Sequence, residues 1–458
     1  MTTEPNLCDG AGMSVPVSEQ TLIVRNFGPI ESCELIVKPI LCFIGPQASG
    51  KSTLSKLIYF CRTVHGDVTE YLLKILEGND ARFDQEALAK RIRARFDATF
   101  GPVRPHYGAR IEFRYNEDAW IVFSQNNPTS PYFDPQFSDS IIRELSNTVD
   151  ESRERFPASP RTSRRAPSNI ASNQLIEQRQ QYVEEQCNKL FSFRRGVFFI
   201  PAGRSLISTL SEQLQNVDSK LLDEPMRLFI QTVNRVKSFF SSSLEDSWAR
   251  YQAIESQVGP DSLVQEAIRV ISLILKGSYE QEGSAGSIRF APNESVKINF
   301  SSSGQQESLW LLLWLFGTAM DGNPDHLFLE EPEAHLFPDA QRQLVELFVR
   351  MHNELGCQFT ITTHSPYILS SVNNLLHAYR VGQKHPEQAA EVVAKEYWLD
   401  PSHAGGFFMT HAGMEPLLDP ELGIYKVELI DSASRKLAED YDRLASIEFS
   451  GEGNNRGA

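Results

Sequence analysis

The sequence predicts an α/β protein whose core is interrupted by a helical lobe. Near the start of the chain, and again after residue 287, short apolar runs are followed by loops and then by apolar residues at helical spacing. Between them, residues 205–280 show helical patterns with few turn signals. Alternating strands and helices indicate a sheet covered by helices, and the central stretch indicates an insertion between two halves of that core. The expected segments are 1–65, 66–286, 287–380 and a C-terminal α/β extension, 381–458.

The composition is that of an ordinary globular protein. The chain has 458 residues, 41% of them hydrophobic, and a prior of about 150 residues per domain gives roughly three domain-sized units. Lys and Arg total 44 against 59 Asp and Glu, so the net charge of −15 argues against nucleic acid covering the whole surface but leaves room for a local basic patch. The longest apolar run, Leu309–Phe316, is too short to span a bilayer, and the six cysteines form no C-x-x-C pair. We therefore expect a cytoplasmic protein with reduced cysteines and no membrane partner.

The first half of the core is expected over residues 21–61. The apolar runs at 21–24 and 33–37 predict two strands joined by a turn at Gly28-Pro29, and the run at 41–44 predicts a short buried strand. After Gly50, apolar residues recur at helical spacing. The order is therefore strand, glycine-containing loop, helix.

The insertion contains both β and helical signals. Residues 109–115 and 119–125 predict a hairpin, a helix is expected over about 173–192, and residues 196–201 are expected to return to the core as a strand. Residues 151–170 contain five Arg, three Pro and four Ser, which is typical of a solvated loop. A contact for phosphate or for an acidic partner is the alternative.

The second half of the core begins after residue 287. A hairpin is expected around Pro292-Asn293, followed by a serine-glycine loop, a long apolar helix, a strand, another helix and the strand 358–363. The remaining residues predict short strands and an amphipathic helix near 432–447.

Residues 45–52, GPQASGKS, fit the pattern G-x-x-x-x-G-K-[ST] between a predicted strand and a predicted helix. Glycines let the backbone wrap a phosphate, successive N–H groups form an anion nest, and the helix N-terminus adds positive potential. Lys51 is expected to reach the β- and γ-phosphates, and the Ser52 hydroxyl is expected to bind Mg²⁺. The predicted ATP-binding residues are Gly45, Pro46, Gln47, Ala48, Ser49, Gly50, Lys51, Ser52 and Thr53.

A second motif is the apolar run at 326–329, which ends in Glu330 and Glu331. A phosphoryl-transfer site needs one carboxylate for the Mg²⁺ shell and one to orient the attacking water. Because the strand ends here, both side chains can serve, and we assign Glu330 to the metal and Glu331 to the water. An acidic turn after a core strand is the plainer alternative.

Two further segments could also contact a phosphate, although each is a less specific signal than the first two motifs. Ser302, Ser303, Gly304 and Gln305 open the apolar helix, where N–H groups and hydroxyls suit a phosphate, although such clusters are usually helix caps. His364 follows the strand 358–363, from which it could bond a γ-phosphate, although a single histidine at a strand end is usually structural.

In this order, the four segments resemble the ABC-class ATPase heads of the RecF, SMC and OLD-like group. The resemblance implies a signature loop at Ser302–Gln305, a D-loop at Ala334–Phe337 and a switch histidine at His364, which would be catalytic together with Glu331. It also implies an ABC-type ATPase head with a mixed sheet, and ATP and Mg²⁺ as cofactors. In this group ATP lies between the phosphate loop of one subunit and the signature loop of another, so the resemblance further implies a homo-oligomer formed by head pairing.

Three positions depart from the usual pattern of this group. The di-acid is Glu330-Glu331 instead of Asp-Glu, as in the OLD-like branch with its EEPE. Ser303 stands where the signature has a middle glycine, which predicts a stiffer loop. The Q-loop residue is open between Arg204, which follows the strand 196–201, and Gln125.

The spacing of the motifs excludes some classes of ATPase. The 259 positions from Gly45 to Gly304 exclude a compact transporter domain and are too few for the paired arm of an SMC protein. The late D-x-D, Asp440 and Asp442, falls in a helical pattern, so we expect no Toprim nuclease in this segment. The layout resembles the ATPase subunits of antiphage systems, such as the PARIS type, that act with a separate Toprim-like nuclease.

The expected function is therefore an ATP-hydrolysing switch that controls a separate effector, with DNA or an acidic or phage protein as the trigger. Two alternatives remain. One is a RecF-like DNA-repair ATPase, for which the locally basic segment Arg153–Arg165 is the supporting feature. The other is a scaffold whose subunits are held together by bound nucleotide and which hydrolyses that nucleotide at a negligible rate.

Overall fold

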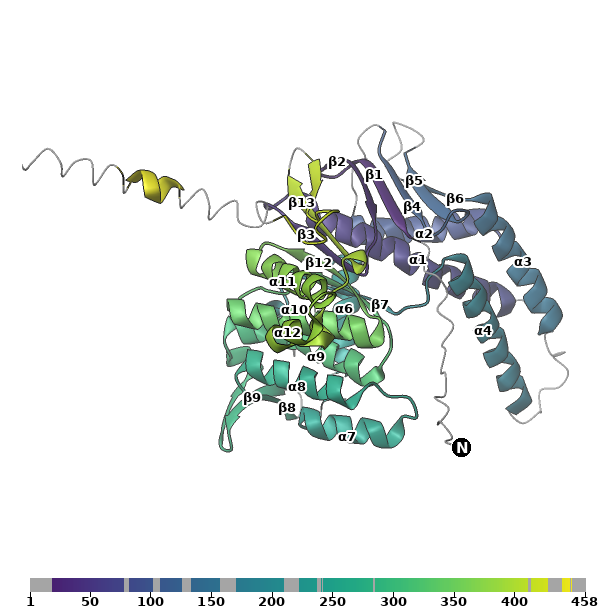
Figure 1. Ribbon diagram of the computed structural model, residues 1–458. Coiled ribbons are helices and arrows are strands. Elements are labelled where there is room, and N and C mark those ends of the chain that lie inside the picture. The colour runs from purple at the N-terminus through teal and green to yellow at the C-terminus, as the bar shows by residue number, and fades with distance from the viewer. Residues whose placement is uncertain are drawn as a thin grey trace, which may run out of the picture.

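A computed structural model describes residues 19–77, 82–101, 108–125, 133–156, 170–209, 222–236, 240, 242–282, 285–410, 413–426, 439–444 and 446. Strands and helices alternate at both ends of the described chain, and helices dominate the middle. In the view of Figure 1, β1, β2, β4, β5 and β6 lie at the top, β3, β12 and β7 lie near the centre among helices, and β8 and β9 lie at the bottom left. The predicted fold class, α/β with a mixed sheet and flanking helices, is confirmed.

The central sheet has six strands in the order β14-β13-β3-β12-β11-β7. All neighbours are parallel except β13 and β14, which pair antiparallel at the edge. Every residue of β3, β11 and β12 is buried, as expected for parallel strands covered on both faces. The bounds are β3 (Ile40–Ile44), β7 (Val197–Ile200), β11 (His326–Glu330), β12 (Gln358–Thr363), β13 (Ala404–Thr410) and β14 (Gly413–Pro416).

Two antiparallel sheets flank the core. The larger has the order β2-β1-β4-β5-β6, so strands from the 66–286 stretch extend the sheet begun by the first hairpin, and the smaller has the order β10-β9-β8. The bounds are β1 (Thr21–Phe27), β2 (Ile30–Ile36), β4 (Arg110–Arg114), β5 (Trp120–Ser124), β6 (Asp134–Phe137), β8 (Ser278–Glu282), β9 (Ala285–Ala291) and β10 (Glu294–Lys297).

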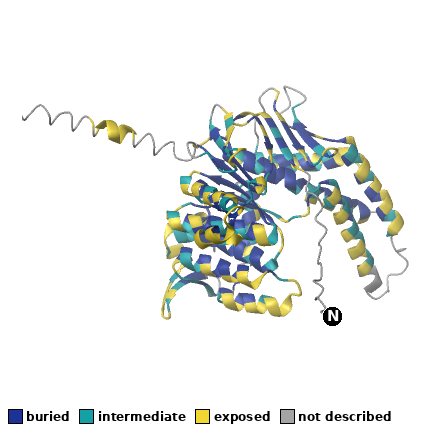
Figure 2. Ribbon diagram, in the orientation of Figure 1, coloured by how far each residue is buried: buried dark blue, intermediate teal, exposed yellow. Residues whose placement is uncertain are grey.

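The helices fall into a packed set and a projecting pair. The α-helices are α1 (Lys51–Glu77), α2 (Gln85–Phe100), α3 (Asp139–Arg155), α4 (Ile170–Leu190), α5 (Ser205–Thr209), α6 (Glu224–Val236), α7 (Leu244–Ile254), α8 (Asp261–Leu275), α9 (Ser303–Asp321), α10 (Pro338–Leu355), α11 (Pro366–Gly382) and α12 (Pro386–Val392). Short 3₁₀ turns are η4 (Ile298–Phe300), η5 (Lys395–Tyr397) and η6 (Pro401–His403). α3 and α4 project from the body, and exposed and intermediate residues cover most of their surface (Figures 1 and 2).

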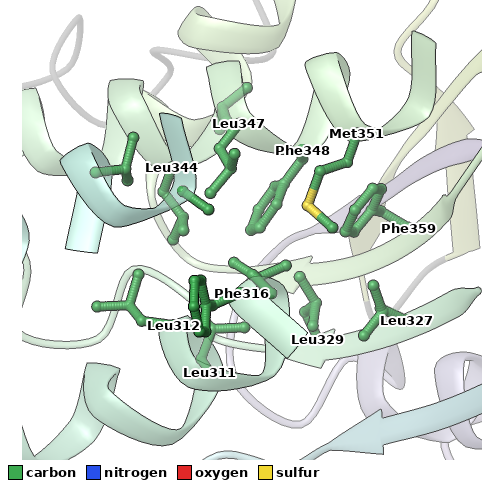
Figure 3. Packing of buried hydrophobic residues seen from close by; sticks show 14 of the residues in the cluster. Leu311, Leu312, Phe316, Leu327, Leu329, Leu344, Leu347, Phe348, Met351 and Phe359 are labelled. Atoms are coloured by element: carbon green, nitrogen blue, oxygen red, sulfur yellow. The ribbon is translucent and has the colours of Figure 1, made fainter. Parts of the chain in front are cut away.

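The largest part of the core lies between α9, α10 and the central sheet. Leu311, Leu312 and Phe316 of α9 and Phe348 and Met351 of α10 form one buried cluster with the β11 side chains Leu327 and Leu329 (Figure 3). At about 1.5–3 kcal/mol for each fully buried large apolar side chain, this cluster is a major source of stability. It holds the ends of β11 and β12 in place.

Most of the predicted elements are present. The structure contains the hairpin at the start of each half, the buried strand β3, the strand β7 at 197–200 and the buried apolar helix α9. Five cysteines are free and buried, and no helix of the described chain is long and apolar enough to cross a membrane.

Some predicted boundaries are wrong. Residues 151–155 are the last turns of α3, because Ile141, Leu145 and Val149 continue an apolar stripe that carries the helix into the charged stretch. The second strand of the hairpin around Pro292-Asn293 was expected to include the run VKINF, 296–300, but residues 298–300 form a 3₁₀ turn. The rest of the arginine-rich segment, 157–169, lies outside the described residues. So does most of the predicted helix at 432–447, of which 439–444 and 446 are described and helical.

Candidate functional site

The candidate site lies where three neighbouring parallel strands end. β3 leads into the glycine-containing loop, β11 ends at Glu330 and β12 ends at Thr363. Because β3, β12 and β11 are adjacent and parallel, their carboxyl ends meet at one edge of the sheet. Ligands of open α/β sheets bind at this edge.

The loop after β3 is shaped by tight backbone contacts. A Cβ atom on Gly45 would lie 2.1 Å from the main-chain oxygen of Met409 in β13, so only glycine fits. Ala48 has a φ of 58° and Gly50 a φ of 98°, both in the left-handed region. Ser49 Oγ donates to Pro46 O at 2.9 Å and closes the loop. Such turns aim successive N–H groups at one point, the geometry of an anion nest.

Lys51 opens α1 and lies inside the loop. Its Nζ donates to Gly45 O and Pro46 O, both at 2.8 Å, and the residue is only 6% exposed. Burial lowers the pKa of Lys51, and the charges of Glu331 and Glu333 act in the opposite direction. The ammonium is therefore held by main-chain oxygens of the loop, at the start of a helix whose N-terminal dipole favours an anion. Ser52, next in the helix, is exposed.

Glu330, the last residue of β11, and Glu331, the next residue, differ in environment. Glu330 is 8% exposed, its Oε2 accepts from Ala202 N at 3.3 Å, and its Oε1 is buried without a hydrogen-bond partner among the described residues. Glu331 has a φ of 44°, which turns the chain out of the strand. Its side chain is 43% exposed, and its Oε1 lies 3.4 Å from His364 Nε2. The structure thus brings Glu331 and His364 together at the solvent-accessible side of the edge.

A third glutamate, Glu333, was missed by the sequence analysis. It is 9% exposed, and its Oε1 accepts from Thr363 Oγ1 at 2.6 Å and from His364 N at 2.9 Å. Glu333 therefore ties the turn after β11 to the residue beside Glu331. Its place in the EEPE run was the only sequence signal, because no spacing rule marks the fourth residue.

Arg204, a Q-loop candidate, is fully buried, and its side chain bonds the main-chain oxygens of the turn after β11. Its Nη1 donates to Glu330 O at 2.7 Å and its Nη2 to Glu331 O at 3.0 Å. Its charge is paired with Glu307 at 3.5 Å. Burial lowers the pKa of Arg204, opposed by the charge of Glu307. The rival candidate, Gln125, follows β5 in the antiparallel sheet, where its N–H donates to Ala109 O at 3.5 Å.

The serine-glycine segment caps α9. Ser302 and Gln305 form a capping box: Gln305 N donates to Ser302 Oγ at 3.4 Å, and Ser302 N donates to Gln305 Oε1 at 3.0 Å. A Cβ atom on Gly304 would lie 2.8 Å from His335 O, so this loop packs directly against residues 334–337. Ser302 and Ser303 remain exposed at the helix N-terminus.

The donor set at this edge fits a magnesium ion held together with a phosphate. Mg²⁺ prefers oxygen ligands and uses one or two carboxylates, with substrate phosphates and waters completing its shell. The buried, unpartnered Oε1 of Glu330 and the hydroxyl of Ser52 are such oxygens. Within the described residues, no group of three or more His, Cys, Asp or Glu side chains could hold a metal without such help.

Fold and site together define a P-loop nucleotide-binding protein: a phosphate loop between strand and helix, with carboxylates at the end of a neighbouring parallel strand. A family model described as an AAA ATPase domain, AAA_15, matches residues 20–369. The match covers well over half of the chain, so the protein belongs to this family of ATPase domains.

Among solved structures, the SMC head domain from Thermotoga maritima is 12% identical with a TM-score of 0.36, covering 87% of this chain and 98% of that one. An SMC head bound to the C-terminal winged-helix domain of ScpA has 12% identity and a TM-score of 0.37, over 87% and 96%. The ABC transporter cassette MJ1267 in its ADP conformation has 12% identity and a TM-score of 0.28, over 87% and 89%. These TM-scores are too low to support an inference about this chain. No curated protein matches it.

Proposed function

We propose that this protein binds and hydrolyses Mg²⁺-ATP, and that the cycle controls the pairing of two copies. The observation that carries the proposal is the meeting of the phosphate loop, Glu331 and His364 at one sheet edge, with Glu331 Oε1 3.4 Å from His364 Nε2. A phosphoryl-transfer site needs a cationic cradle and a carboxylate that can orient water, and these residues supply both.

Each residue then has a defined task. The loop N–H groups and Lys51 bind and orient the β- and γ-phosphates. Ser52 and Glu330 hold magnesium, which supplies positive charge to the transferred group when bound. Glu331, half exposed and beside His364, orients a water and accepts its proton, and His364 donates a hydrogen bond to the γ-phosphate.

Exposed aromatic side chains support pairing with a second copy. Phe300 is 75% exposed just before the signature segment, Phe337 is 79% exposed at the end of the D-loop, and Tyr367 is 52% exposed three residues after His364. The signature and D-loop segments touch at Gly304. Large apolar side chains gathered around a polar site are typical of an interface, and this one would place the Ser302 helix end against the partner's nucleotide.

The biological role we propose is the ATPase subunit of an antiphage system that controls a separate Toprim-like nuclease. Support comes from the sequence resemblance to such subunits. In the described chain, moreover, Asp440 and Asp442 lie in an exposed helical stretch. The direct test is phage challenge of cells carrying this gene with its neighbours, with Lys51→Ala as the control. Equal plaque counts for the intact set and the control would refute the defence role.

Lys51→Ala and Glu331→Gln test the ATPase proposal. Lys51→Ala should abolish ATP binding because the phosphates lose their fixed cation. Glu331→Gln should bind ATP with unchanged affinity but release phosphate at least about 100-fold more slowly, because the water-orienting carboxylate is lost. Nucleotide-binding and phosphate-release assays separate the two, and hydrolysis at the wild-type rate by Glu331→Gln would refute its role.

Ser302→Arg tests the shared site. Alone, it should bind ATP but neither pair nor hydrolyse, because its side chain fills the space for the partner's phosphate. Mixed with Lys51→Ala, it should regain activity, since one site per mixed pair is then built from two intact halves. Full activity of Ser302→Arg alone would refute the composite site. Stimulation of the wild type by DNA would instead favour the repair-ATPase alternative.

A further inference from the structure

Glu333 holds an acceptor atom that the rest of the protein leaves unused. Its Oε1 is fully engaged by Thr363 Oγ1 and His364 N. Its Oε2 is buried and has no hydrogen-bond partner among the described residues. A buried acceptor left unpaired costs about 1–3 kcal/mol, so native proteins retain one where an ion, a water or a substrate completes it.

Glu330 shares this property at the same place. Its Oε1 is also buried and without a partner in the described structure. Glu330 is in register with Thr362 at the end of β12, and Glu333 bonds the next residue, Thr363. Two unused carboxylate oxygens therefore lie at one strand end.

The nearby cations do not bond these oxygens. Arg204, which is fully buried, is paired with Glu307 at 3.5 Å. Lys51 Nζ donates to the main-chain oxygens of Gly45 and Pro46. Burying an uncompensated carboxylate is costly, and a divalent cation beside the two unused oxygens would relieve that cost.

We propose that Glu333 is a second carboxylate of the magnesium site, with its two oxygens doing different work. Oε1 positions His364 through the backbone N–H, and Oε2 accepts a hydrogen bond from a water of the magnesium shell. Mg²⁺ keeps several waters and needs few protein ligands, which suits a buried outer carboxylate beside Glu330. The inference rests on the proposed function only in that the protein must bind Mg²⁺-ATP.

The test measures binding of a fluorescent ATP analogue to the full chain as magnesium is raised. Glu333→Gln keeps a carbonyl oxygen for Thr363 and His364 but replaces the second oxygen by an NH₂ donor. We expect it to need at least about 10-fold more Mg²⁺ for half-maximal binding, with unchanged affinity in EDTA. Thr363→Val, the matched control, removes only one of the two donors to Oε1 and should leave the magnesium midpoint unchanged while slowing phosphate release.

Equal magnesium midpoints for wild type and Glu333→Gln would overturn the proposal and leave Glu333 a purely structural clamp. If Glu333→Gln does not fold, a second experiment uses the wild type with Fe²⁺ in place of Mg²⁺. With ATP and peroxide present, cleavage of the backbone next to Glu333 would support the proposed site. Cleavage only at other positions would overturn it. A wild type that binds Mg²⁺-ATP without releasing phosphate would refute hydrolysis but leave this test intact, because its readout is binding.

Discussion

Arg204→Met should uncouple the di-acid turn from the sheet. The guanidinium donates to four main-chain oxygens, those of Pro201, Glu307, Glu330 and Glu331, at 2.7–3.0 Å, and is fully buried. At a net of about 1–1.5 kcal/mol each, these bonds total about 4–6 kcal/mol, and packing of the methionine offsets part of the loss. We expect the free energy of unfolding to fall by about 3–5 kcal/mol, the range for breaking a buried ion pair.

Glu307 provides the internal check. Burial acts to raise the pKa of Glu307, but the Arg204 charge and the N–H groups of Arg204 and Ser205 outweigh it and hold that pKa below its ordinary value. Without Arg204 the carboxylate loses its counter-charge, so Arg204→Met/Glu307→Gln should be less destabilised than the sum of the single variants, by about 1–3 kcal/mol. The surface pair Arg143–Glu144, with side chains 66% and 48% exposed, gives the matched control. Arg143→Met should cost less than about 1 kcal/mol.

Urea denaturation followed by circular dichroism measures the wild type and the four variants, and ATP binding and phosphate release are measured on the folded samples. Arg204→Met should still bind ATP, because the phosphate loop is anchored to β13, but should lose hydrolysis as the main chain of Glu330 and Glu331 moves. A loss of stability below about 1 kcal/mol for Arg204→Met, or strict additivity in the double variant, would refute the reasoning.

Three further outcomes follow from particular contacts. Gly45→Ala should lower the melting temperature and weaken ATP binding, because its Cβ would lie 2.1 Å from Met409 O; unchanged binding in a titration would contradict this. Burial, with a smaller effect of Asp321, raises the pKa of Asp325 to about 6, so folding disfavours its ionised form. That cost is nearly absent at about pH 3 and complete, at up to about 3 kcal/mol, above about pH 7, so Asp325→Asn should be more stable than wild type in urea at pH 8 and equal to it at pH 3. Phe337→Ser should keep the melting temperature but weaken ATP-dependent pairing at least about 10-fold in sedimentation, since a 79% exposed side chain adds little to the fold; pairing as strong as wild type would remove Phe337 from the interface.

Local patterns predicted the elements that carry the motifs. The strand predicted at 41–44 is present as β3 (Ile40–Ile44) because apolar residues fill the space between Pro39 and Gly45. The two carboxylates at the end of β11 were found because an apolar run ends there. These signals are confined to a few neighbouring residues, which a sequence displays directly.

Contacts between residues far apart in the sequence could not be predicted from these local patterns. Nothing in the run AGGFFMT indicates that β13 lies parallel to β3 and that Met409 limits the space at Gly45. The two bonds that Glu333 accepts come from residues about thirty positions away. Which acceptors are engaged depends on tertiary packing, and a hydrophobicity pattern carries no information about it.

The position of β3 between β12 and β13 also has a consequence for synthesis of the chain. About 320 residues separate the end of β3 from the end of β12, and the other neighbour comes later still. At about 5–20 residues per second, a ribosome needs roughly 15–60 s to supply the first of them. For that time the apolar strand ILCFI has neither of its permanent neighbours, and unpaired apolar strands are aggregation hazards. We therefore expect nascent chains of this protein to depend on chaperones until residue 363 has emerged, and ribosome-bound chains ending before β12 to be the species that chaperones retain.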